Sequence, residues 1–300
     1  MAATVGESPR SQANPDDVEA ALTALESAEN PLVIVGKGMS WSRAEDEVRE
    51  FIERTQLPFL ASPMGKGVMP DDDPLSVGAA RSTALREADV VLLMGARLNW
   101  IMHFGLPPRF KEGVRVIQLD VAAEEMGTNV PAEVALLGDG KAITAQLNRA
   151  LDDRQWFFPA EAPWRATLKE KAEENQAQVA PMVDDDAAPM NYYRAYRDIE
   201  DWLPENAIVI GEGANTMDIG RTQMANRSAR NRLDAGSYGT MGIGLGFTIG
   251  AAVVAPDQPV VAVQGDSAFG FSGMEVETAC RYGLPVKIVV LNNGGIGGGI

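Results

Sequence analysis

Short apolar runs that end at a glycine or a small polar turn most constrain the fold of this chain. They occupy 31–36 (PLVIVG), 57–62, 88–96, 114–120, 207–213, 260–267 and 286–293. Runs of this length are typical of strands buried on both faces of a parallel sheet. Segments with helical spacing lie between them, such as 41–55 with Val48, Phe51 and Ile52. This alternation predicts an α/β fold of two Rossmann-like domains with mainly parallel sheets.

Polar stretches between these runs predict the domain boundaries. Residues 1–17 are polar and rich in turn formers, which indicates a flexible lead-in. From 153 to 188 charges, alanines and prolines replace the α/β rhythm, which predicts a linker that is helical over 164–178. The first domain is therefore predicted over 18–152 and the second over 189–300.

Composition excludes several classes of partner and site. The formal net charge of -16 argues against nucleic acid or an anionic membrane as the main partner, because both require a basic face. No apolar run reaches the roughly 20 residues of a membrane-spanning helix, and nothing resembles a signal peptide. The single cysteine, Cys280, allows no internal disulfide and is interpreted as a core residue. We therefore expect a cytoplasmic protein, in which the single histidine, His103, has a packing or surface role.

Two polar residues near the C-terminal end follow consecutive strands of one predicted β-α-β unit. The S-x-x-E spacing of Ser272 and Glu275 predicts that its helix begins near Gly273. Because the strands are parallel, Asp266 and Asn293 should emerge at one sheet edge, about 4.8 Å apart if the strands are neighbours. Their carboxylate and amide oxygens suit Mg²⁺, which fills its other positions with water and phosphate oxygens. Ordinary strand-end turns remain the alternative, since Asp, Asn and Gly are common there.

Two further glycine-rich turns favour the interpretation as a magnesium-diphosphate site. GEGANTMD (211–218) follows a predicted strand and places Asn215 and Thr216 near the same sheet edge. GSYGTMGIGLG (236–246) precedes a short apolar helix. Glycine-rich turns along one edge leave a trench lined by backbone N–H groups, which suits a flat, charged cofactor.

Together these segments resemble the thiamine-diphosphate enzymes, whose cofactor signature runs from GD(G/S) to NN over just under thirty residues. The stretch GDSAFGFSGMEVETACRYGLPVKIVVLNN (265–293) has this form. The resemblance implies thiamine diphosphate and Mg²⁺ as cofactors, with the metal held by Asp266, Asn293 and the Gly295 carbonyl. The cofactor contacts that it implies are Asn215, Thr216, Gly239, Met241, Gly265, Ser267, Ala268 and Asn293. Gly239 would accept from the aminopyrimidine amine, and Met241 would bend the cofactor.

Four other segments narrow the resemblance to the 2-hydroxyacyl-CoA lyases. They are SPMGKGVMPDD (62–72), RLNWIMHFGLPPRF (97–110), NYYRAYRDI (191–199) and EGANTMDIGRT (212–222). The resemblance implies cleavage of a 2-hydroxyacyl-CoA to formyl-CoA and an aldehyde, or the reverse condensation. Oxalyl-CoA decarboxylase, a close relative, is the alternative within the same class. A non-catalytic module that binds a nucleotide or CoA is the alternative from another class.

The resemblance also implies components beyond these two domains. In the family a pyrimidine-binding domain precedes the part seen here and supplies the carboxylate that activates the cofactor. We expect another segment or chain to supply that domain and the acid–base residues, and we expect the second domain to be truncated at its C-terminal end. The exposed apolar faces then predict a homodimer or homotetramer. Eukaryotic relatives of this kind are peroxisomal.

Basic residues offer candidate phosphate contacts for ADP or CoA bound by the first domain. Lys37 lies in GKG on a predicted strand-to-helix turn, where it meets either a phosphate or solvent. Arg227, Arg230 and Arg232 form a basic patch in an acidic protein. This patch can bind the phosphates of CoA, or its members can form surface ion pairs. Both interpretations stay open at this point.

Overall fold

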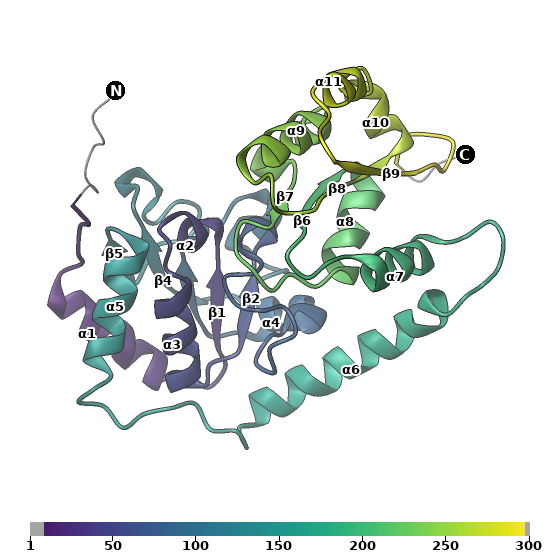
Figure 1. The fold of residues 1–300 in the computed structure, drawn as a ribbon. Helices are drawn as coiled ribbons and strands as arrows, with labels where there is room; N and C mark the ends of the chain where they lie inside the picture. Colours follow the sequence, from purple (N-terminus) through teal and green to yellow (C-terminus); the bar gives the residue numbers. More distant parts are fainter. Residues whose placement is uncertain (1–8, 298–300) are drawn as a thin grey trace, which may run out of the picture.

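The computed structural model of the protein describes residues 9–297 and contains two separate parallel sheets (Figure 1). The first sheet has the strand order β2-β1-β3-β4-β5. Its strands are β1 (Pro31–Val35), β2 (Phe59–Ala61), β3 (Val90–Met94), β4 (Arg115–Asp120) and β5 (Val134–Leu137). Every residue of β1 and β3 is buried, as expected for central strands that are covered on both faces.

Five helices surround the first sheet. They are α1 (Pro15–Glu26), α2 (Lys37–Trp41), α3 (Glu45–Thr55), α4 (Arg81–Glu87) and α5 (Gly140–Ala150). Short 3-10 helices lie in the connections: η1 (Pro63–Gly65), η2 (Gly78–Ala80), η3 (Trp100–Gly105) and η4 (Ala123–Glu125). The side chain of Asp139 caps α5 by accepting a hydrogen bond from the N–H of Ala142 at 3.0 Å. The helix expected to begin near Asp139 is therefore confirmed.

A 21-residue helix, α6 (Pro163–Val183), connects the two sheets. Trp164 in its first turn is buried in the first domain, where its indole N–H donates to the carbonyl of Pro31 at 2.9 Å. Further along, the chain enters α7 (Tyr192–Trp202), which also packs against α6. The helix expected over 164–178 is therefore present and longer than expected. No helix in the described part of the chain, α6 included, is long and apolar enough to cross a membrane.

The structure describes only part of the predicted lead-in, residues 1–17. Residues 1–8 of the predicted lead-in lie outside the described residues. Ala13, in its later part, is buried against the first domain, and its N–H donates to Oε1 of Gln146 at 3.0 Å. This part of the lead-in is packed rather than flexible. The boundaries placed at 18, 152 and 188 stay predictions.

The second sheet has the order β7-β6-β8-β9, and all its strands are parallel. Its strands are β6 (Ile208–Glu212), β7 (Arg232–Leu233), β8 (Val260–Gly265) and β9 (Lys287–Leu291). Its other elements are α8 (Ala214–Gln223), η5 (Gly236–Tyr238), α9 (Gly244–Val254), α10 (Asp266–Ser272) and α11 (Glu275–Arg281). Together with the first sheet it confirms the predicted α/β class with two parallel sheets.

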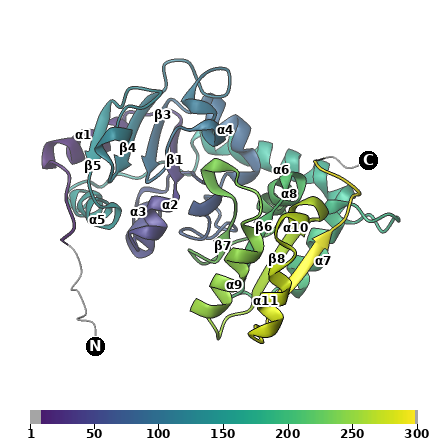
Figure 2. The same cartoon turned by 90° about the horizontal axis from the view of Figure 1, so that it is seen from above.

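Helices cover both faces of the second sheet, as Figure 2 shows. On one face Val209 and Val261 pack with Tyr196 of α7, and α8 lies beside them. On the other face Ile210 packs with Leu245 of α9, next to α10 and α11. The alternation of apolar side chains between two faces explains why these strands are apolar throughout.

Two helices follow β8 where the sequence predicts one. The helix expected to begin near Gly273 is α11, which begins at Glu275, but no side chain caps it, so the predicted capping pair of Ser272 and Glu275 is wrong. The chain is already helical from Asp266 to Ser272, as α10, which the sequence did not predict. Gly265 is extended at the strand end and caps the helix directly, while Asp266 favours the positive end of the helix dipole. Cys280 on α11 is exposed rather than in the core, because α11 lies at the surface of the domain.

The segment between α8 and β7 is fastened to the first domain. The carboxylate of Asp71 accepts from Nζ of Lys66 at 2.7 Å and from the N–H of Asn226 at 2.9 Å. Gly67 has a φ of +83°, and a Cβ there would lie 2.2 Å from the carbonyl oxygen of Ser228. Only glycine permits this conformation and this close approach of two backbones. The two domains are therefore in direct contact through well-defined polar groups.

Candidate functional site

Three strands of the second sheet end at one edge, and the residues predicted to bind the cofactor follow them. β6 leads into α8 through Gly213, β8 leads into α10 through Gly265, and β9 leads into the turn that contains Asn293. Gly265 is paired with Leu291, so the last residues of β8 and β9 are level. The structure therefore places Asp266 and Asn293 at the same sheet edge, although Asp266 lies in a helix rather than in a turn.

The N-termini of α8 and α10 approach each other closely at this edge. Gly213 has a φ of +109°, and a Cβ on it would lie 3.3 Å from the backbone nitrogen of Gly265. A Cβ on Gly265 would in turn lie 3.2 Å from Oγ1 of Thr216. The first N–H groups of a helix have no partner within it and carry partial positive charge, so two such ends together suit a diphosphate.

Four of the predicted contacts lie in the first turns of these two helices. Asn215 and Thr216 belong to α8, and Thr216 is buried. Ser267 and Ala268 belong to α10, and Ala268 is also buried. The structure thus brings these residues together from segments about fifty positions apart in the sequence. Their contacts with a diphosphate stay a prediction.

The turn after β9 folds back onto α8. Nδ2 of Asn293 and Nδ2 of Asn215 both donate to the carbonyl of Gly297, at 3.0 and 3.1 Å. Oδ1 of Asn293 accepts from the N–H of Gly295 at 3.3 Å, which leaves this oxygen a second lone pair. These contacts fix the turn against the helix that would bind the diphosphate.

The donor chemistry at this edge suits Mg²⁺ better than a transition metal. Nowhere in residues 9–297 do three or more Asp, Glu, His or Cys side chains form a group that could hold a metal ion. The predicted ligands Asp266, Asn293 and Gly295 supply one carboxylate, one amide oxygen and one carbonyl. Mg²⁺ accepts so few protein ligands where phosphate oxygens and water complete its shell. The ligand assignment itself stays a prediction.

Glu212 holds the loop 236–243 in place, and the sequence analysis did not identify it. It is the last residue of β6 and is fully buried. Its Oε1 accepts from the N–H of Gly242, and its Oε2 accepts from the N–H of Gly244 at 2.6 Å. Nε2 of Gln264 donates to Oε2 at 3.4 Å. The sequence did contain a signal for this role, namely a charged residue at the end of an apolar strand. A carboxylate buried at such a position requires hydrogen-bond donors around it.

The loop that Glu212 holds carries two of the predicted cofactor contacts. Gly239 has a φ of +61° in the left-handed region, with open space around it. Met241 is exposed, and a Cβ on Gly242 would lie 3.4 Å from Cβ of Phe271 on α10. The loop thus lies along α10 and presents its outer residues to solvent or to a bound group.

A separate cavity of about 470 Å³ lies at the carboxyl edge of the first sheet. Lys37 lines it, together with Trp41, Arg97 and Asp120. Gly236 and Ser237 of the second domain close one side, and Nδ2 of Asn99 donates to Oγ of Ser237 at 3.2 Å. The structure therefore places Lys37 where a phosphate could reach it, at the strand-to-helix turn that the sequence predicted.

The three predicted phosphate-binding arginines do not form a surface patch, and that expectation is wrong. Arg227 pairs with Asp72 at 2.8 Å and Arg230 pairs with Glu45, both across the domain contact. Arg232 is 2% exposed, because β7 inserts it beside β6, and burial lowers the pKa of its guanidinium. None of the three lines the cavity. The alternative of ion pairs is thus what the structure shows for Arg227 and Arg230.

Comparison with known families assigns both domains. Residues 18–147 match the family described as "Thiamine pyrophosphate enzyme, central domain". Residues 213–298 match "Thiamine pyrophosphate enzyme, C-terminal TPP binding domain". The second match contains α8, the 236–243 loop, α10 and the turn after β9. The edge described above therefore lies within a thiamine-pyrophosphate-binding domain.

Individual relatives belong to two kinds of CoA enzyme. The chain is 53% identical over 292 residues to 2-hydroxyacyl-CoA lyase 1 of Mus musculus, which covers 96% of this chain and 50% of that protein. It is 52% identical to 2-hydroxyacyl-CoA lyase 1 of Homo sapiens over the same shares. It is also 45% identical to oxalyl-CoA decarboxylase of Escherichia coli (strain K12) over 94% of this chain and 50% of that protein. The chain thus spans about half the length of these relatives.

Replacing Glu212 tests whether it organises the loop. In Glu212→Gln one acceptor oxygen becomes an NH₂ donor that faces a backbone N–H. We expect the free energy of unfolding to fall by about 1–3 kcal/mol, the cost of an unsatisfied buried group, as measured by chemical denaturation. Affinity for thiamine diphosphate should fall as well. Glu277→Gln is the control, because Glu277 is exposed and pairs with Arg281 on its own helix. Equal stability of the two variants would contradict the assignment.

Proposed function

This chain belongs to the thiamine pyrophosphate enzymes, and we propose that the full-length protein is a 2-hydroxyacyl-CoA lyase that uses thiamine diphosphate and Mg²⁺. The observation that carries the proposal is the meeting of α8, α10 and the turn after β9 at one sheet edge within the cofactor-binding domain. Its proposed reaction cleaves a 2-hydroxyacyl-CoA to formyl-CoA and an aldehyde one carbon shorter. In the reverse direction it joins formyl-CoA to a carbonyl compound.

Within this proposal each part of the edge has a separate task. The N–H groups of α8 and α10, with Asn215, Thr216, Ser267 and Ala268, bind the diphosphate. Asp266, Asn293 and the Gly295 carbonyl hold Mg²⁺. The carbonyl of Gly239 would accept from the aminopyrimidine amine, and Met241 would pack against the cofactor as an apolar wedge. When bound, thiamine diphosphate supplies an electron sink for the carbon–carbon bond cleavage, while the protein supplies binding and orientation.

The cavity in the first domain is the proposed site for a nucleotide, either ADP or the nucleotide part of CoA. Its glycine-lined strand end and Lys37 suit a phosphate, and the exposed ring of Trp41 offers a flat apolar wall. Direct titration of ADP and of CoA, compared with Lys37→Ala, tests this site. Unchanged affinity for both ligands in that variant would exclude Lys37.

The proposed enzyme requires a partner surface, because the exposed residues of the second domain include large apolar side chains. Tyr238 is 97% exposed, Met274 is 85% exposed, and Phe271 on α10 is 63% exposed. Patches of this kind mark sites of protein association. We propose that a pyrimidine-binding domain, from another segment or from another copy of the protein, covers this face.

Covering this face by a second copy predicts a dimer or a tetramer. Sedimentation of the full-length protein at micromolar concentration measures this directly. We expect species of at least twice the mass of one chain, because burying this apolar surface favours association. Tyr238→Ser combined with Met274→Ser should shift the equilibrium toward monomer. A wild-type protein that sediments only as a monomer contradicts the proposal.

Loss of the Asp266 carboxylate should abolish cofactor binding. In the full-length protein we expect Asp266→Ala to lose magnesium-dependent binding of thiamine diphosphate in titration calorimetry, because Mg²⁺ then has no carboxylate ligand. Asp257→Ala, an exposed residue between α9 and β8, should bind as wild type. The alternative of a non-catalytic nucleotide-binding module makes a different prediction. In that case ADP or CoA binds to the wild-type protein and thiamine diphosphate never does.

Product analysis separates the lyase from oxalyl-CoA decarboxylase, to which the chain is also similar. We expect a 2-hydroxyacyl-CoA, thiamine diphosphate and Mg²⁺ to give formyl-CoA and an aldehyde, identified by mass spectrometry. The competing activity would release carbon dioxide from oxalyl-CoA. Turnover of oxalyl-CoA alone, with no aldehyde from any 2-hydroxyacyl-CoA, would replace the proposed reaction by decarboxylation.

A further inference from the structure

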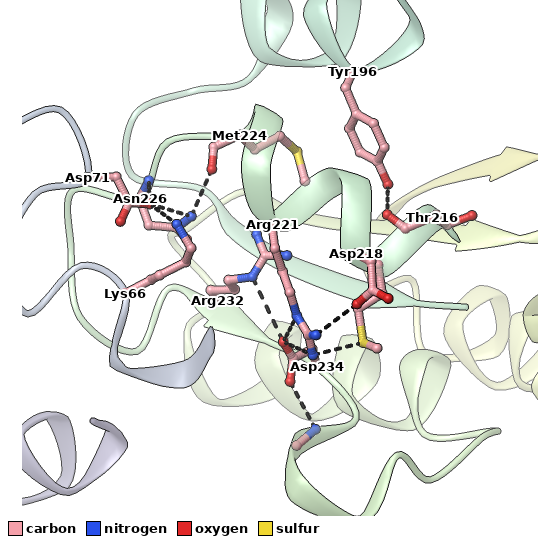
Figure 3. A network of polar contacts seen from close by, with 12 residues as sticks. Lys66, Asp71, Tyr196, Thr216, Asp218, Arg221, Met224, Asn226, Arg232 and Asp234 are labelled. Carbon is pink, nitrogen blue, oxygen red and sulfur yellow. Dashed lines mark hydrogen bonds and ion pairs between the residues drawn. The ribbon is translucent and has the colours of Figure 1, made fainter. Parts of the chain in front are cut away.

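A buried charge cluster joins helix α8 to the beginning of the 236–243 loop (Figure 3). The cluster consists of Arg221 on α8, Arg232 in β7 and Asp234, which directly follows β7. Nε and Nη2 of Arg221 lie 3.1 and 3.0 Å from Oδ2 of Asp234. Nε of Arg232 lies 4.0 Å from the same oxygen, and the side chain of Asp234 is fully buried. One carboxylate therefore lies between two guanidinium groups.

The second oxygen of Asp234 fixes the loop. Its Oδ1 accepts from the N–H of Gly236 at 2.9 Å, and Gly236 turns the chain with a φ of +61°. The carboxylate thus contacts α8 through one oxygen and the loop backbone through the other. Gly239 and Met241 follow within five residues of this anchor.

The buried guanidinium of Arg232 depends on the negative charge of Asp234. Its three guanidinium nitrogens have no hydrogen-bond partner among the described residues, and Asp234 is the carboxylate that lies near them. Removing that charge would leave the buried guanidinium of Arg232 facing a neutral group, whereas Arg221 would still pair with Asp218 at 2.9 Å. A buried charge without its partner is strongly destabilising. The loop would then move away from the position that Asp234 holds.

Helix α8 does not depend on Asp234 for its position. The hydroxyl of Tyr196 on α7 donates to the carbonyl of Thr216 in the first turn of α8 (Figure 3). A Cβ on Gly220 would lie 2.8 Å from that same hydroxyl oxygen, so helix and ring are in close contact. The diphosphate end of the site is thus held by α7 and the sheet, and the loop end is held by Asp234.

We propose that Asp234 is a positioning residue that sets the distance between the diphosphate-binding helix and the loop that contacts the aminopyrimidine. Asp234 is buried and acts through the backbone of Gly236, without touching the cofactor. This inference rests on the proposed function, because it assumes that Gly239 and Met241 contact thiamine diphosphate.

Two ligands of different length test the proposal in the full-length protein. Magnesium thiamine diphosphate contacts both ends of the site, whereas magnesium pyrophosphate contacts only the diphosphate end. For Asp234→Asn we expect affinity for thiamine diphosphate to fall by roughly 10-fold or more, as when partners that orient binding groups are removed. Affinity for pyrophosphate, measured by calorimetry, should stay at the wild-type value. The near-ultraviolet circular dichroism of saturating bound cofactor should also change, since it reports on the aminopyrimidine.

Two further variants separate positioning from general stability. Arg221→Gln keeps the contact between Asp234 and Gly236 and serves as the test variant if Asp234→Asn does not fold. It should also lower the affinity for thiamine diphosphate, by a smaller factor, and leave the affinity for pyrophosphate unchanged. Glu45→Gln removes the carboxylate partner of Arg230, just before β7, without reaching the loop. It should change neither affinity nor the dichroism spectrum.

Each result has one meaning. Parallel loss of both ligands in Asp234→Asn and Arg221→Gln, or wild-type affinity and dichroism in both, would overturn the positioning role. If pyrophosphate does not bind the wild-type protein, the dichroism of the bound cofactor tests the proposal instead. A changed spectrum in Asp234→Asn supports the positioning role, and an unchanged spectrum overturns it. If the wild-type protein does not bind thiamine diphosphate at all, the proposed function fails instead.

Discussion

The parallel pairing of β8 with β6 and β9 is the constraint on which the candidate site depends. Because Gly265 is paired with Leu291, the last residues of β8 and β9 end level, and every group that follows a strand emerges at one edge. The first turns of α8 and α10 and the turn after β9 then meet at that edge. A shift of one residue in this pairing would turn the side chains of a strand to the opposite face. The central strands β6 and β8 resist such a shift because both of their faces are filled.

Strand pairing does not fix the position of a loop. In this protein buried carboxylates fix the 236–243 loop by accepting hydrogen bonds from its backbone. Glu212 holds the end of the 236–243 loop through two backbone N–H groups, and Asp234 holds its beginning through one. Each unsatisfied N–H would cost about 1–3 kcal/mol, so the two acids give the loop one preferred conformation. Glycines in the loop permit the turns that bring its N–H groups to these acceptors. Two acidic residues that contact the backbone of the loop thus determine where the proposed cofactor contacts lie.

The sequence was sufficient for features that depend on local pattern. Apolar runs predicted most strands and the parallel class, and the order of Asp266 and Asn293 predicted their common edge. Features that depend on tertiary pairing were missed or wrong. Arg232 lies in the polar stretch NRSARNR and gives no signal of burial, because β7 has only two residues and exists through its pairing with β6. The sequence missed α10 because Ser272 and Glu275 match a capping pattern near the start of α11, while the extended Gly265 begins a separate helix seven residues before Ser272.

The two domains are joined through the same loop that serves the candidate cofactor site. Ser237 closes one side of the first-domain cavity and binds Asn99, whereas Met241 lies four residues further along the loop. Upstream, Asn226 is fixed to Asp71 of the first domain by a hydrogen bond of 2.9 Å. The segment from Asn226 to Gly244 is therefore held at its start by Asp71, in its middle by Asp234 and at its end by Glu212. A group that binds in the first-domain cavity has to fit against this loop. A movement of the loop would consequently change both the shape of that cavity and the position of Met241 at the second-domain edge.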